Sequence, residues 1–143
     1  MNSNPLAAYR EVRVKTASPA QIVVMLYEEA VKQCDRALDL MSGMEGRNPR
    51  NIEKINAALG KAQDVVTELM AGLDFDAGGD IAQDLFALYV WFNRELMEAN
   101  VEKNEKRVRA VRDQLDTLRG AWAEAATKAQ NGGQGQVGVN IAG

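Results

Sequence analysis

Three helix start signals divide this sequence and constrain its fold more than any other feature. Ser18, Asn48 and Asp80 are N-cap residue types, and each stands next to a proline or a glycine that favours a helix boundary. Together with a weaker break at 100–104, they predict four helices, at about 18–43, 49–73, 80–102 and 104–129. The connections are short, so consecutive helices should be antiparallel. We therefore predict an all-α fold, an antiparallel up-down four-helix bundle.

Two end segments flank the predicted bundle of residues 18–129. Residues 1–17 form a short N-terminal segment. Residues 130–143 read QNGGQGQVGVNIAG, and a glycine-rich stretch of this kind predicts a flexible tail.

Composition argues against several classes of partner. A net charge of −3 disfavours nucleic acid, which is held largely by neutralising phosphates. The first residues lack the apolar core of a signal peptide, and no apolar run approaches the roughly 20 residues that cross a bilayer, so we expect no direct membrane insertion. Cys34 is the single cysteine, which fits a reducing cytoplasm, and we interpret it as a small buried apolar residue.

The chain also lacks the usual residues of catalysis. It contains no histidine, which removes Ser-His and Cys-His nucleophiles and the common zinc ligand sets. The acidic stretch DFDAGGD fails as a calcium loop, because Gly78 and Leu85 stand where oxygen ligands are needed. No glycine-rich phosphate loop occurs. We predict neither an enzyme nor a bound metal or cofactor.

Two of the predicted helices carry more apolar surface than one core stripe requires. The second helix confines its apolar residues to about 140° of its circumference, whereas the first spreads them over about 200°. In the third helix, Phe86, Val90 and Met97 extend the core stripe sideways. A helix that touches two neighbours can bury such an arc without a partner; alternatively, part of the arc forms a groove for a foreign helix. The composition leaves both explanations open.

A set of short pieces, in order along the chain, resembles a known family. The pieces are AY at 8–9, VKTASP at 14–19, MLYEEAV at 25–31, KAQDVVTELMAGLD at 61–74, GGDIAQDLFALY at 78–89, NRELMEANVEKN at 93–104 and LRGAW at 118–122. Together they resemble the flagellin-specific export chaperones of the bacterial flagellum (FliS). The chain departs from the family pattern at Glu28 and Glu29, where MLYDG is usual, and at Val90, where an acidic residue is usual. The tail beyond Gln130 has no counterpart in the family.

The resemblance implies a cytoplasmic helical bundle that binds the C-terminal segment of flagellin in a hydrophobic groove. It further implies that the chaperone prevents premature filament polymerisation and delivers flagellin, as a 1:1 complex, to the flagellar type III export gate. A homodimer of the free protein through the uncovered groove is the other association to consider. The apolar edges then supply the flagellin-binding residues: Val24, Tyr27, Val31, Leu38, Phe86, Val90 and Met97.

The same resemblance implies two roles for the N-terminal segment. The segment would cover part of the groove when no flagellin is bound, and contact the export gate when flagellin is bound. The apolar residues available are Leu6, Tyr9, Val12 and Val14. The plainer alternative is a disordered terminus without a role.

Other functions remain open at this point. The same groove would suit a helical adaptor or an anti-sigma-type regulator that binds another amphipathic segment. A small enzyme is the least favoured reading, given the missing histidine and phosphate loop.

Overall fold

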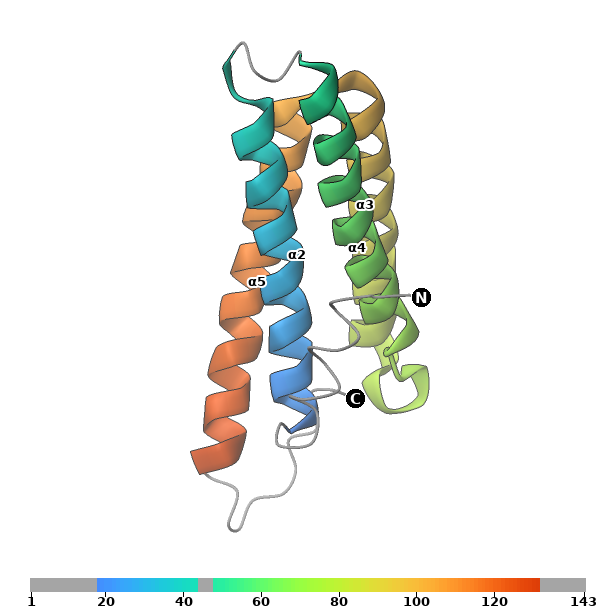
Figure 1. Cartoon of the computed structure of the whole chain (residues 1–143). Coiled ribbons are helices and arrows are strands. Elements are labelled where there is room, and N and C mark those ends of the chain that lie inside the picture. Colours follow the sequence, from blue (N-terminus) through green and yellow to red (C-terminus); the bar gives the residue numbers. More distant parts are fainter. Residues whose placement is uncertain (1–17, 44–47, 132–143) are drawn as a thin grey trace, which may run out of the picture.

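A computed structural model describes residues 18–43 and 48–131 of the chain (Figure 1). These ranges hold four helices and no strand: α2 (Pro19–Met41), α3 (Pro49–Ala71), α4 (Phe75–Glu102) and α5 (Glu105–Asn131). The predicted all-α fold is confirmed. The end segment 1–17 and residues 132–143 of the predicted tail lie outside the described residues.

The four helices form a closed ring of neighbours. α2 packs against α3 and α5, and α4 packs against the same two helices from the other side. Figure 1 shows the helices running lengthwise beside one another, with the connections at alternate ends. α2 and α4 therefore lie diagonally opposite, which is the predicted antiparallel up-down bundle.

Local capping explains where three of the helices begin. The backbone N–H of Gln21 donates to Ser18 Oγ at 3.2 Å, and Ser18 N–H donates back to Gln21 Oε1 at 2.9 Å, so the predicted capping box is present. Asn48 Oδ1 accepts from Arg50 N–H at 2.9 Å. At the start of α5, Asn104 Oδ1 accepts from the N–H of Arg107 at 3.2 Å. Each cap satisfies a backbone donor that the first helical turn leaves free.

The start of α4 differs from the prediction. The helix begins at Phe75 rather than at Asp80, because Asp74 already caps it: Asp74 Oδ1 accepts from two backbone N–H groups at 3.0 Å each. One helical turn follows, and then the backbone breaks at Gly79, which has φ 52° and ψ −126°. The segment predicted to be a loop is thus a short helical turn with a break directly before Asp80.

The core contains a polar contact across the diagonal of the bundle. The hydroxyls of Tyr27 on α2 and Tyr89 on α4 form a buried hydrogen bond. Burial raises the pKa of both phenols, and for Tyr27 the nearby Tyr89 raises it further while Trp122 acts in the opposite direction. Both hydroxyls are therefore neutral. Cys34 is also fully buried, and burial, together with the neighbouring Asp35, raises the pKa of its thiol to about 12. It is a core residue, as predicted.

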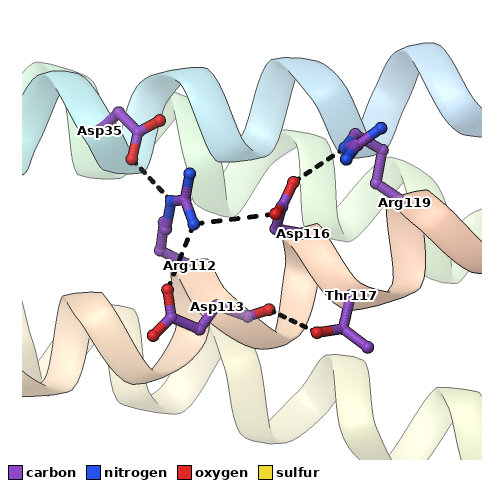
Figure 2. Close-up of polar contacts among 6 residues, drawn as sticks. All are labelled: Asp35, Arg112, Asp113, Asp116, Thr117 and Arg119. Carbon is purple, nitrogen blue, oxygen red and sulfur yellow. Dashed lines mark hydrogen bonds and ion pairs between the residues drawn. The ribbon is translucent and has the colours of Figure 1, made fainter.

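A row of ion pairs runs along α5, and one of them reaches α2 (Figure 2). Arg112 on α5 donates from Nε to Asp35 Oδ1 on α2 at 2.8 Å, and its Nη1 lies 3.3 Å from Asp113 and 3.8 Å from Asp116, both on α5. Arg119 binds Asp116 at 2.8 Å. These side chains are partly exposed, so each pair contributes well under about 1 kcal/mol. Of these pairs, Arg112–Asp35 links α5 to α2, and the others lie within α5.

Candidate binding surface

The predicted groove residues of α2 lie beneath its neighbours. Tyr27, Val31 and Leu38 are 0%, 8% and 7% exposed and belong to the core cluster, and Val24 is half-buried against it. The expectation of an open groove wall at Val31 is therefore wrong for the free chain. The physical reason is that α2 packs far more extensively against α3 and α5 than α4 does, so these two helices cover its wide apolar arc.

What remains accessible at Val31 faces charge rather than an apolar groove. The shallow depression between α2 and α5 is lined by Val31, by charged side chains of α2 such as Glu28 and Lys32, and by Arg119 of α5. Charges of both signs surround it, so it offers little to an apolar segment.

The predicted residues of α4 meet a different environment. Phe86, Val90 and Met97 are 41%, 39% and 52% exposed, and no neighbouring helix of the described bundle covers them. Val101 is 81% exposed. We call these four residues the α4 stripe.

Helical geometry places the four side chains in one line. Their spacings of four, seven and four residues keep them within about 60° of one another around the helix axis. At about 1.5 Å per residue, Phe86 and Val101 are about 22 Å apart along α4, or roughly four turns. Sequence reasoning missed Val101, although its position four residues after Met97 was a signal that could have found it.

The edge of the stripe that faces α3 is polar. Asn93, between Val90 and Met97 in the sequence, donates from Nδ2 to Thr67 Oγ1 on α3 at 3.2 Å. Gln63 of α3 donates from Nε2 to the Asn93 carbonyl at 3.4 Å. These bonds hold α3 and α4 together and set the stripe on the outer side of their contact.

The C-terminal end of α4 is fixed by Lys103. This residue has a left-handed backbone at the helix C-cap, with φ 54°, and its Nζ donates to Asn56 Oδ1 on α3 and to Asn100 Oδ1, each at 2.7 Å. Burial lowers the pKa of Lys103. The contact ties the last turn of α4, next to Val101, to α3.

The other side of α4 is charged and belongs to the contact with α5. Arg107 of α5 lies 2.8 Å from Glu95, 2.9 Å from Glu98 and 3.2 Å from Glu102. With α3 on one side and α5 on the other, α4 is anchored in a way that leaves the α4 stripe facing outward.

Two other kinds of feature, a metal-ligand cluster and a membrane-spanning helix, do not occur in the part of the chain that the structure describes. Among the described residues, no group of three or more potential metal-ligating side chains comes together. Within the same ranges, no helix is both long and apolar enough to span a membrane.

With this geometry in place, comparison with known proteins gives the family. A family model described as flagellar protein FliS matches residues 2–129. The chain belongs to the FliS family. The match covers the whole described bundle up to the last turn of α5 and confirms the resemblance inferred from the short pieces.

Curated relatives of this FliS-family chain match along nearly their full length. A flagellar secretion chaperone FliS of Salmonella typhimurium is 32% identical over 130 residues, which cover 87% of this chain and 91% of the relative. The protein of the same name from Vibrio cholerae is 29% identical over 138 residues, with 94% and 97% coverage. That of Bacillus subtilis is 26% identical over 136 residues, with 95% and 96% coverage.

Some of the pieces that carry the family resemblance serve the fold of this FliS-family chain. Tyr27 of MLYEEAV and Tyr89 of GGDIAQDLFALY meet in the core. Phe86 of the latter piece instead faces solvent. The family match thus does not separate core residues from surface residues, whereas the burial of each side chain does.

Proposed function

We propose that this FliS-family chain is a cytoplasmic flagellar export chaperone that binds the C-terminal segment of flagellin along the α4 stripe. In this proposal the bound segment cannot polymerise prematurely, and the complex delivers flagellin to the flagellar export gate. The observation that carries the proposal is the uncovered α4 stripe, in a chain whose relatives are named flagellar secretion chaperones.

The dimensions and chemistry of the stripe support an amphipathic helical occupant. A line of apolar side chains about 22 Å long matches the apolar face of roughly four helical turns. If the segment is disordered before it binds, its ordering opposes the gain from apolar burial and keeps the complex reversible. Reversibility is necessary for a chaperone that must release its cargo for export.

The two sets of predicted groove residues then have different roles. Phe86, Val90 and Met97, with Val101, contact flagellin directly. The α2 set, Val24, Tyr27, Val31 and Leu38, supports the bundle from within.

The N-terminal segment completes the proposal. Leu6, Tyr9, Val12 and Val14 would cover part of the stripe in the free protein and contact the export gate in the complex. These residues lie outside the described part of the chain, so the support for this role is the family membership. Release of the cover also exposes a surface through which free chains would form the homodimer.

Isothermal titration with flagellin tests the proposal. We expect a 1:1 complex with full-length flagellin, with a strongly negative heat-capacity change because apolar surface is buried as the segment orders. Flagellin that lacks its C-terminal segment should show no measurable binding. Equal affinity for both forms would defeat the proposal and favour a helical adaptor or anti-sigma-type regulator for another amphipathic segment.

A further inference from the structure

The first turn of α4 holds an aromatic side chain on the surface of the bundle. Phe75 is 47% exposed, and its ring meets that of Phe86 edge-to-face, with the centroids 5.9 Å apart and the planes at 65°. Phe86 is the first residue of the α4 stripe. Phe75 therefore continues the stripe beyond its N-terminal end.

A regular helix could not make this contact. Residues 75 and 86 are eleven positions apart, which in a continuous α-helix separates them by about 16 Å along the axis. The break at Gly79 is what brings the two rings together, because it turns the segment of Phe75–Gly78 out of line with the rest of α4.

The residue types in this turn are those that the broken backbone requires. Gly79 has φ 52° and ψ −126°, a backbone conformation that L residues with a side chain rarely adopt. At Gly78 an added Cβ would lie 2.8 Å from the Cβ of the buried Ala82. Asp74 caps the turn, and its carbonyl accepts from the N–H of Gly78 at 2.7 Å. Asp74, Gly78 and Gly79 thus each meet a structural requirement of the turn that fixes the position of Phe75.

The stability of the bundle does not account for this arrangement. Phe75 is outside the core cluster and keeps about half of its surface in contact with water. Two glycines in succession also cost conformational entropy on folding. A preformed, exposed aromatic pair at the end of an apolar stripe has the properties of a binding hot spot, because a rigid aromatic surface loses little entropy when a partner covers it.

We infer that Phe75 is a cargo-binding residue, held by the Gly78–Gly79 break so that the Phe75–Phe86 pair receives an apolar anchor side chain at one end of the amphipathic flagellin segment. The inference rests on the proposed function, since it takes flagellin as the occupant. Two observations support it: Phe75 continues the α4 stripe through its contact with Phe86, and the capped turn with its break at Gly79 fixes the position of Phe75.

A double-mutant cycle tests it by isothermal titration of the full chain with full-length flagellin. Phe75→Ala should weaken binding at least tenfold. Gly79→Ala should weaken it by a similar factor, because alanine disfavours the break and so displaces Phe75. The double variant should bind within about twofold of Phe75→Ala alone, since Gly79 acts through Phe75. Gly120→Ala on α5, where an added methyl group meets nothing within 4 Å, is the matched control and should bind like the wild type.

The outcomes separate the inference from the function on which it rests. If the wild type itself does not bind flagellin, the proposed function fails. If the wild type binds and Phe75→Ala binds equally well, the inference is overturned and the function stands. A Gly79→Ala effect that is as large in the Phe75→Ala background as in the wild type overturns the positioning role. Circular dichroism checks each fold, and if Gly79→Ala loses helix, Phe75→Ala decides alone.

Discussion

At the scale of single residues, Val31 and Val90 show that coverage by neighbouring helices decides whether an apolar side chain belongs to the core or to the surface. Both lie at the edge of a wide apolar arc, yet Val31 is 8% exposed under the α2–α5 contact, and Val90 is 39% exposed on the outside of α4. A charge at Val31 would lose most of its hydration, because the side chain is buried in the core cluster. A charge at position 90 would remain hydrated.

Substitution by aspartate should therefore separate the two positions. Val31→Asp should reduce the free energy of unfolding by about 3 kcal/mol or more, through burial of the carboxylate in the core. Val90→Asp should cost less than about 1 kcal/mol, mostly through helix propensity. Urea denaturation followed by circular dichroism measures both. Equal losses at the two sites would show that Val90 is also a core residue.

A second residue-level prediction concerns the tyrosine pair. Tyr27→Phe or Tyr89→Phe removes the buried hydrogen bond between the two hydroxyls, so each should cost about 1–2 kcal/mol in stability. The double variant removes both polar groups and should cost less than the sum of the single changes. Additive losses in urea denaturation would mean that the two hydroxyls do not depend on each other.

At the scale of elements, capping and burial differ in how far the sequence predicts them. The starts of α2, α3 and α5 were predicted because a cap such as Ser18 or Asn48 acts within three residues of the helix it begins. The predicted start of α4 was wrong, because Asp74 caps an extra turn and Gly79 breaks the helix after that turn.

The apolar arcs show the limit of periodicity as a guide to the site. Periodicity found the wide arcs of α2 and α4 but not which one a neighbour covers, because that depends on contacts between helices far apart in the sequence. The residues Phe86, Val90 and Met97 were predicted as surface sites on α4, and their exposure agrees. Of the α2 residues predicted for the same surface, Tyr27, Val31 and Leu38 lie in the core, and Val24 is half-buried against it.

The α4 element carries its own prediction. Met97→Lys places a charge in the middle of the stripe at a side chain that is 52% exposed, so its stability should change by less than about 1 kcal/mol. Flagellin binding should weaken at least tenfold, or by about 1.4 kcal/mol. Ala121→Lys adds the same charge to an exposed position of α5 and serves as the control. Equal binding by both variants would argue that flagellin does not use the stripe.

At the scale of the whole molecule, the ring of four helices divides surface from core. α2 packs extensively against α3 and α5 and is linked to α5 by the Arg112–Asp35 ion pair, whereas α4 packs less extensively against the same two helices and its outer side is free. The bundle thus exposes the α4 stripe to solvent while its core remains buried. In the proposed function, this asymmetry lets the chaperone offer a binding surface while it remains folded.

Site-specific photo-crosslinking tests that claim most directly. The change Val90→p-benzoylphenylalanine places a photoreactive group on the α4 stripe, and the same group at Ala121 on α5 is the control. On irradiation with full-length flagellin, we predict crosslinks from position 90 to the C-terminal segment of flagellin, identified by mass spectrometry, and none from position 121. Crosslinks from position 121 to that segment, with none from position 90, would contradict the account.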